Sequence, residues 1–508
     1  MNWFWLHRHR GRRATSAGGL PHGSARRLAR KKAARRIGYA WLSVVLAVAV
    51  AGCTGSPGST GQARATTAAS PSPVLISRTV PDAPVGRQLT WFLHAVADIP
   101  WSQQVIRAHF DPGAHLDPGV VLGGVDEFNS TFEQALAAEG ASTSSGGSLT
   151  GLLWQAPARD PVSLLAVAAF GSARLAVNIS VDGAGLISGL LFYPYLSSWA
   201  QIDQELGALA PDASLLAARV SPGGNCTPVH QVAASAARPL ASMFKLFVLG
   251  ALAHQIAAGR VSWTQDLTVT DALKSAGAGS LQDVPAGTRV SVRQTAAQMI
   301  ELSDNTAADM LIHLVSRSAA QAQDRQWSDH AALNVPFLTT RELFLLKGVD
   351  YPALANQYLS LAPPRRAAFL ASSVDPLPFS QALGQSVGTA SPIDIGTIEW
   401  FASPDDICRA FAGLQQLAAQ PGLAPVGSIL SANDGNDGGV GLDPAQWRTV
   451  WFKAGSEPGV LAVGFLATNS KGQTFVVAGM LSDPAAVLPL SALYGLLAIA
   501  QAAFELVR

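Results

Sequence analysis

The order of strand-like and helical segments in the second half of the chain most constrains its fold. Strand-like runs lie near both ends of this half, at residues 215–220, 229–233, 449–452, 460–467 and 474–481. Helical patterns fill the interval to about residue 420, and a last apolar helix is expected at 489–507. Strands from distant sequence must therefore share one sheet. This order predicts an α+β sandwich over residues 212–508, with an inserted helical domain, and not a doubly wound parallel sheet.

A smaller unit is expected at residues 85–211. A helical pattern at 89–97 is followed by strand-like runs at 164–170, 175–181 and 186–193, the last two joined as a hairpin. These elements predict a small α+β domain. Few polar residues converge in it, which favours a structural or positioning role; the alternative is a domain with a ligand pocket.

The chain starts with a basic segment, a short apolar run at residues 37–52, and Cys53. The run is short for a bilayer span and has the layout of a signal peptide. Because Val50-Ala51-Gly52-Cys53 resembles a bacterial lipobox, we expect a lipoprotein signal at 1–53, a lipid on the thiol of Cys53, and an extracytoplasmic, membrane-anchored protein. A retained signal anchor is the alternative. Residues 54–84, rich in Ser, Gly, Thr, Ala and Pro, are expected to form a disordered tether.

Charge and cysteines narrow the possible partners. Of the 35 basic residues, 11 lie in residues 1–40, which contain no acid, so 24 remain against 34 acidic residues, a net charge of −10. A body this acidic argues against a nucleic-acid partner. The other two cysteines, Cys226 and Cys408, are either a disulfide or two free thiols, since sequence supplies no distance between them. No metal-ligand spacing follows the signal, so neither a metal nor a cofactor is expected.

Ser242-Met243-Phe244-Lys245 opens a long apolar helical pattern without a helix breaker. On the first turn of a helix, Ser242 and Lys245 would share a face. A serine hydroxyl needs a base to become a nucleophile. A lysine is such a base only when neutral, and burial beside a second cation favours the neutral form. Alone, this motif is also compatible with an ordinary helix carrying a surface lysine.

Two further motifs follow in a fixed order. Ser303-Asp304-Asn305 lies about sixty residues on, after a helical pattern, and Lys453-Ala454-Gly455 ends the strand-like run 450–452. Ser-x-x-Lys, Ser-Asp-Asn and Lys-Thr-Gly, in this order, are the signature of serine β-lactamases and penicillin-binding proteins.

With these motifs the C-terminal part resembles a class A β-lactamase-like serine hydrolase. Residues 242–252, 299–307, 398–406 and 452–459 are more closely similar to an actinobacterial subgroup, the clavulanate-cluster serine hydrolase and LpqF lipoprotein. The resemblance implies a five-stranded antiparallel sheet with a helical domain, preceded by an NTF2-like (steroid-isomerase-like) α+β domain. It also implies an esterase activity rather than a β-lactamase activity.

The resemblance assigns a role to each motif residue. Ser242 would be the acylated nucleophile, Lys245 its general base and Ser303 a proton shuttle to the leaving group. Asn305 would bind the substrate or hold Lys245. Lys453 would lower the pKa of Lys245 and bind a substrate carboxylate. The backbone N–H groups of Ser242 and Ser456 would form the oxyanion hole, with Gly455 beside them.

Two departures from the family pattern bear on the substrate. Ala454 replaces the usual threonine, which removes one hydroxyl from a carboxylate site. The Glu-x-x-Leu-Asn loop that hydrolyses the acyl-enzyme in class A β-lactamases is missing, because residues 384–393 contain no acid. Glu342 is too early for that role, and Glu399 is too close to Pro404 and is interpreted as a structural carboxylate.

The sequence therefore favours a serine hydrolase that forms an acyl-enzyme on Ser242 with a small ester or β-lactam-like substrate. Without the deacylating glutamate, a β-lactam would acylate and stall, whereas an ester would turn over through Lys245. The alternatives are a true β-lactamase, a D,D-peptidase, and a non-catalytic binding lipoprotein. The acyl group, leaving group and oligomeric state are not predicted.

Overall fold

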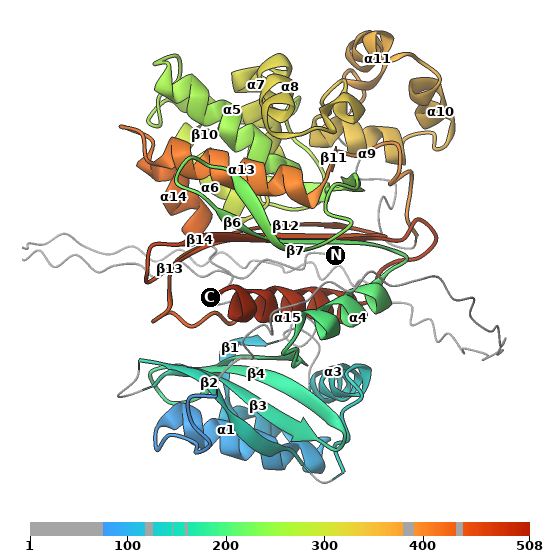
Figure 1. Ribbon diagram of the computed structural model, residues 1–508. Coiled ribbons are helices and arrows are strands. Elements are labelled where there is room, and N and C mark those ends of the chain that lie inside the picture. The colour runs from blue at the N-terminus through green and yellow to red at the C-terminus, as the bar shows by residue number, and fades with distance from the viewer. Residues whose placement is uncertain (1–74, 117–124, 145, 158–160, 379–390, 433–439) are drawn as a thin grey trace, which may run out of the picture. The chain divides into compact units, whose positions relative to one another are not determined.

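The computed structural model describes residues 75–508 apart from 117–124, 145, 158–160, 379–390 and 433–439 (Figure 1). Cys53, the signal at 1–53 and most of the expected tether at 54–84 lie outside the described residues.

The N-terminal part is a mixed sheet with helices. Its described elements are α1 (Pro84–Ala95), α2 (Gln103–His109), β1 (Phe110–Leu116), α3 (Val125–Ala138), β2 (Ser148–Ala156), β3 (Ser163–Phe170), β4 (Ala173–Val181) and β5 (Ile187–Pro194). The strand order is β1-β5-β4-β3-β2, with β1 parallel to β5 and the other pairs antiparallel. The predicted strands and their hairpin are confirmed. We did not predict β1 or β2, whose Pro112, Gly113 and Gly151 weaken a strand pattern, and we did not predict α2 or α3.

The second sheet is formed from both ends of the C-terminal part, as predicted. Its strands are β6 (Asp212–Val220), β7 (Cys226–Val232), β12 (Trp447–Glu457), β13 (Val460–Asn469) and β14 (Thr474–Ser482). They pair antiparallel in the order β12-β13-β14-β6-β7, so β12 is an edge strand. Strand β6 thus pairs with β14 across more than 250 residues of chain, with Thr474 opposite Val220.

Helices cover both faces of this sheet (Figure 1). On one face lies α15 (Leu490–Val507), which contacts β14 and β13. Among the described helices only α15 is long and apolar enough to cross a membrane by length and composition, yet 83% of it is buried inside the protein. That burial is typical of a core helix.

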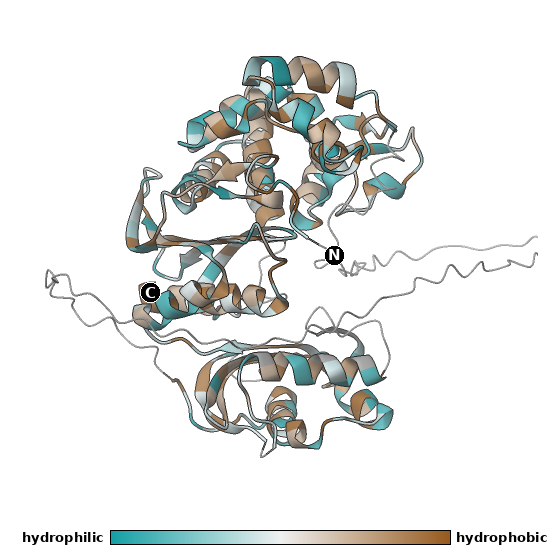
Figure 2. Ribbon diagram, turned by 90° about the vertical axis from the view of Figure 1, so that its right-hand side faces the viewer, coloured by the Kyte–Doolittle hydropathy of each residue, from teal (hydrophilic) through white to brown (hydrophobic). Residues whose placement is uncertain are grey.

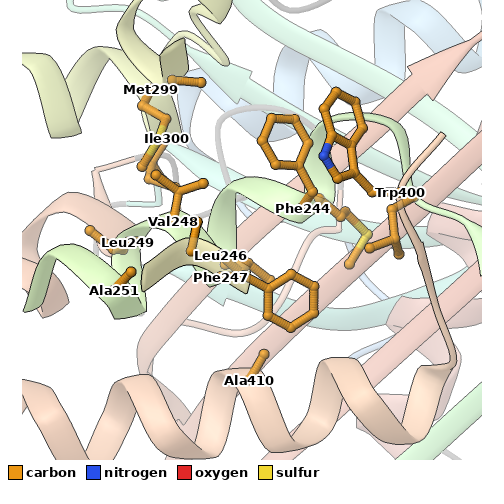
Figure 3. Packing of buried hydrophobic residues seen from close by; sticks show 14 of the residues in the cluster. Phe244, Leu246, Phe247, Val248, Leu249, Ala251, Met299, Ile300, Trp400 and Ala410 are labelled. Atoms are coloured by element: carbon orange, nitrogen blue, oxygen red, sulfur yellow. The ribbon is translucent and has the colours of Figure 1, made fainter. Parts of the chain in front are cut away.

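The other face carries the inserted helices. They are α5 (Lys245–Ala257), α6 (Val292–Glu301), α7 (Asn305–Val315), α8 (Arg317–Trp327), α9 (Thr340–Gly348), α10 (Ala353–Leu359), α11 (Pro363–Phe369), α13 (Pro404–Ala418) and α14 (Ala424–Ser431), while α4 (Trp199–Leu209) precedes β6. Helix α5 is apolar all round and is central to the cluster, between Ala410 of α13 and Ile300 of α6 (Figure 3). Each outer helix contains both hydrophobic and hydrophilic residues, as is typical of helices with one face in solvent (Figure 2).

The helical interval also contains short strands that the sequence pattern did not predict. They are β8 (Arg238–Pro239), β9 (Asp266–Thr268), β10 (Arg289–Ser291) and β11 (Phe401–Ala402). The pair β8–β11 matters for function, because it ties the segment before Pro404 to the segment before Ser242.

Cys226 and Cys408 are joined by a disulfide with a Cα–Cα distance of 6.3 Å. The bond links the edge strand β7 to helix α13, 182 residues apart in the chain. A cross-link over a loop of this length restricts the unfolded chain and typically stabilises a protein by about 2–5 kcal/mol.

Candidate active site

Ser242 lies in a 3₁₀ turn, Ala241–Phe244, and α5 begins only at Lys245. Our expectation that Ser242 occupies the first turn of the α-helix is therefore wrong. Ala241 has a φ of 43°, a left-handed value that strains a residue with a side chain. The turn is nevertheless compatible with the expected pairing, since Lys245 Nζ lies 3.0 Å from Ser242 Oγ.

Lys245 is fully buried and is surrounded by neutral oxygens. Its Nζ lies 3.2 Å from Ser303 Oγ and 2.6 Å from Asn305 Oδ1, and it also bonds the carbonyl oxygen of Ser303. Burial lowers the pKa of Lys245 to about 7, against a smaller opposing effect of Asp304 and Asp309. A neutral amine in this position has a lone pair available for the Ser242 hydroxyl proton.

The Ser303-Asp304-Asn305 motif forms a rigid corner at the start of α7. Asp304 caps the helix by accepting from Ala307 N at 2.8 Å, and its other oxygen accepts from Ser280 N and Leu281 N. Ser303 has a φ of 48°. This strained corner directs both Ser303 Oγ and Asn305 Oδ1 at Lys245. Asn305 is fixed in turn because its Nδ2 donates to Ala276 O at 2.8 Å.

Lys453 completes the polar cluster from the edge strand. Its Nζ lies 3.0 Å from Ser303 Oγ and 2.7 Å from Ala454 O, so the Ser303 hydroxyl bridges the two lysines. Burial, and secondarily the charge of Lys245, hold the pKa of Lys453 well below its ordinary value. We expected burial and Lys453 together to lower the pKa of Lys245; burial is the largest cause, and Lys453 is not among the others.

Strand β12 does not end at Lys453-Ala454-Gly455, as we expected, but continues to Glu457. A Cβ atom at Gly455 would lie 2.1 Å from Leu240 O and 2.6 Å from Ser242 N, so only glycine allows this approach. The edge strand therefore lies directly against the nucleophile turn. Ser456 is exposed at the next position, with its backbone on the same strand.

These residues line one cavity of about 260 Å³. The cavity contains Ser242, Ser303, Asn305 and Lys453. Its apolar lining includes Phe244, Leu343, Phe344, Trp400, Leu461, Leu488 and Leu493. Such a site, mostly apolar with a few convergent polar groups, suits a small organic molecule.

The two glutamates considered from the sequence have defined positions. Glu342 is buried, accepts from both guanidinium nitrogens of Arg317, and closes a capping box with Thr339, so it is structural. Glu399 is buried and lines the cavity. The sequence analysis did not single out its neighbours Glu457 and Lys347. Glu457 lies within residues 452–459, which resemble the actinobacterial subgroup, and this resemblance was the one sequence signal for it. The acid-free window 384–393 lies largely outside the described residues.

In the described part of the chain, no group of three or more His, Cys, Asp or Glu side chains could hold a metal ion.

Comparison with known proteins matches residues 224–360 to the family described as the Beta-lactamase enzyme family. This segment includes Ser242, Lys245 and the Ser303-Asp304-Asn305 motif, but not Lys453. No curated protein matches the chain. With the sheet and helices described above, the match confirms the predicted α+β, class A β-lactamase-like serine hydrolase fold.

Similar solved structures include a β-lactamase from Sphaerobacter thermophilus, at 20% identity over 61% of this chain and 97% of that chain, with a TM-score of 0.41. PBP-A is 18% identical over 62% of this chain and 99% of that chain, with a TM-score of 0.40. An ancestral class A β-lactamase is 16% identical over 60% of this chain and 98% of that chain, with a TM-score of 0.42.

Proposed function

We propose that this chain, with its β-lactamase-like serine hydrolase fold, is an exported esterase that forms an acyl-enzyme on Ser242. One observation carries the proposal: a buried lysine with a pKa of about 7 lies 3.0 Å from a serine hydroxyl at the wall of a cavity. Lysines are ordinarily charged at neutral pH and cannot accept a proton. A lysine that is half neutral at pH 7 is matched to general-base catalysis.

Acylation would proceed by transfer of the Ser242 proton to Lys245 Nζ as Oγ attacks the ester carbonyl. The oxyanion would bind to the backbone N–H groups of Ser242 and Ser456. Because Ser303 Oγ lies 3.2 Å from Lys245 Nζ, the Ser303 hydroxyl can give its proton to the departing alkoxide and regain one from Lys245, which becomes neutral again. The products of this step are the Ser242 ester and the free alcohol.

Deacylation requires a base for water. In the absence of a Glu-x-x-Leu-Asn loop, Lys245 is the remaining candidate, and it can act once the leaving alcohol has vacated its space. A β-lactam keeps its leaving group tethered after ring opening, so it would block that space. This contrast favours esters over β-lactams as turned-over substrates, with β-lactams as slow acylating agents.

Further parts of the proposal rest on sequence resemblance. We propose membership of the actinobacterial clavulanate-cluster and LpqF subgroup, an NTF2-like class for the N-terminal α+β domain, and membrane attachment through lipid on Cys53. The disulfide between Cys226 and Cys408 supports export, because such bonds persist in oxidising compartments. A globomycin-sensitive shift in electrophoretic mobility, absent from Cys53→Ser, would test the anchor.

Intact-protein mass spectrometry tests the activity. Wild type and Ser242→Ala are mixed with a fluorophosphonate, a cephalosporin carrying a 3′-acetate, and a penicillin. We expect a fluorophosphonate adduct on wild type alone, deacetylated cephalosporin with an intact ring, and a long-lived penicillin adduct. Rapid penicillin turnover would favour a true β-lactamase, and the absence of every adduct would favour a binding lipoprotein.

A further inference from the structure

A second charged cluster lies beside Ser242 and is not used in the mechanism above. It contains Glu399, just before β11, Glu457, at the end of β12, and Lys347, in α9. Glu399 and Lys347 are buried, and Glu457 is exposed over only 18% of its side chain. Glu399 and Glu457 both line the cavity that contains Ser242.

Glu399 is tied to the nucleophile turn through the backbone. Its Oε2 accepts from Ala241 N at 3.2 Å and from Trp400 N at 2.6 Å. Ala241 is the strained residue that immediately precedes Ser242. The same segment is held from the side, because Leu240 N donates to Trp400 O and the Trp400 ring stacks on Phe244 at 3.7 Å (Figure 3). A strained conformation persists only when its surroundings hold it in this way.

Glu457 is tied to the other side of the proposed oxyanion hole. It directly follows Ser456, and two residues earlier Gly455 lies against Ser242 N. Both carboxylate oxygens of Glu457 accept from Lys347 Nζ, at 2.9 and 2.8 Å. Lys347 thereby neutralises one carboxylate. The cluster contains a second carboxyl group, that of Glu399, which has no such cation.

Burial, and then the negative charge of Glu457, raise the pKa of Glu399 well above its ordinary value, although Lys347 opposes this. A hydrogen bond between the two carboxyl groups favours the same protonated form of Glu399, since two carboxylates have no donor between them. With Glu399 protonated, the carboxylate of Glu457 balances the ammonium of Lys347, and the cluster is neutral.

We propose that Glu399 and Glu457 share one proton and, with Lys347, act as positioning residues that fix the spacing between the two oxyanion-hole N–H groups, those of Ser242 and Ser456. The inference rests on the proposed role of Ser242 as nucleophile. Loss of the proton leaves two adjacent carboxylates against one lysine. Their repulsion separates the nucleophile turn from strand β12 and weakens oxyanion binding.

This device adds an alkaline limit to activity. The charged groups that face Glu399 are Glu457 from β12 and Lys347 from α9, while Lys453 and Glu301 line the same cavity. Lys245 becomes a better base as pH rises, so it cannot cause a decline above neutral pH. Deprotonation of Lys453 can cause such a decline if catalysis requires its charge. Variants of Glu399 and Glu457 distinguish this cause from loss of the shared proton.

The test compares Glu399→Gln, Glu399→Ala and Glu457→Gln in the full chain, with a 4-nitrophenyl ester as substrate. A glutamine at 399 keeps an oxygen for Ala241 N and Trp400 N and supplies a permanent donor to Glu457. We expect Glu399→Gln to keep kcat within about threefold of wild type and Glu399→Ala to lower kcat about 10- to 100-fold with a smaller change in KM. Both Glu→Gln variants should lack the alkaline decline.

The matched control is Asp324→Asn, which changes another buried carboxyl whose pKa is raised to about 7 by burial, in α8. It should leave the alkaline decline in place. An equal loss of kcat in Glu399→Gln and Glu399→Ala would overturn the proposal, because it would mean that an ionised Glu399 is needed. A wild-type decline retained in both Glu→Gln variants would overturn it as well.

A measurement that does not depend on catalytic activity tests this inference separately from the proposed function. At pH 7, the infrared spectrum of wild type should contain a buried protonated carboxyl band that is missing from Glu399→Gln. If no ester or fluorophosphonate reacts with wild type, the proposed function fails, and the infrared band still decides whether the proton is shared. Absence of that band at pH 7 would overturn the shared proton whatever the activity.

Discussion

Lys245 and Lys347 are both buried lysines near Ser242, and they differ in the oxygens that surround them. Lys245 contacts only neutral oxygens, from Ser242, Ser303 and Asn305. Lys347 contacts both oxygens of a carboxylate, that of Glu457. Burial without a carboxylate partner lowers the pKa of a lysine, as at Lys245, whereas a carboxylate partner favours the charged form and opposes the effect of burial. The charge of the surrounding oxygens, rather than burial, thus distinguishes the lysine that we propose as the general base from the lysine of the ion pair.

Replacing Lys245 by arginine is expected to have the largest effect. Arginine keeps the positive charge but does not release its proton in proteins, so the general base is lost. We expect kcat/KM for an ester to fall by about 10³- to 10⁴-fold. The measurement is steady-state hydrolysis beside a thermal unfolding scan. An arginine variant with more than a tenth of wild-type activity would remove Lys245 from the role of base.

Removing the structural lysine should damage stability rather than chemistry. Lys347→Met leaves Glu457 without its cation, and breaking a buried ion pair typically costs about 3–5 kcal/mol. We expect a free energy of unfolding lowered by about this amount in urea at pH 7. The loss should shrink at low pH, where the carboxyl groups are protonated. A variant as stable as wild type would mean that Lys347 contributes little to the cluster.

A carboxylate partner for Lys245 should make its surroundings resemble those of Lys347 and raise its pKa. Asn305→Asp places a negative charge at the atom that lies 2.6 Å from Lys245 Nζ. The charge raises the pKa of Lys245, so less of it is neutral at pH 7, and we expect about 10- to 100-fold less activity there. Activity should recover at higher pH. Asn305→Ser, which adds no charge, is the control and should lack this pH-dependent recovery.

The smallest expected effect is the change in wild-type activity with pH, which reports directly on the protonation of Lys245. Burial lowers the pKa of Lys245 to about 7, so the amine is charged below this pH and neutral above it. Log kcat/KM should therefore rise with pH and level off near 7, with a slope of about one per pH unit on the acid side. The same shift predicts stability that grows between about pH 7 and the unfolded pKa, because the unfolded chain binds more protons there. A flat profile from pH 5 to 8 would contradict a lysine base.

The sequence predicted the order of the motifs, the antiparallel sheet from distant strands and the polar residues around Ser242. These predictions depend on residue type and spacing, which the sequence contains without any knowledge of tertiary contacts. The 3₁₀ turn at Ser242 was missed, because its backbone is held by Glu399 and by β8–β11 pairing, contacts over some 160 residues. The Glu399–Glu457–Lys347 cluster was missed for the same reason, since its members lie in three distant segments of the chain and form no local pattern.

The pairing of β6 with β14 has a consequence for the newly made chain. The β6–β7 hairpin leaves the ribosome some 250 residues before β14, so one long strand edge waits without its neighbour throughout that interval. Unpaired strand edges attract other chains. Cys408 emerges well before β14, so a Cys226–Cys408 bond made at that stage would cover the hairpin with α13 while synthesis continues. In the exported protein that we propose, this disulfide would then restrain the hairpin before β14 is made, in addition to stabilising the finished fold.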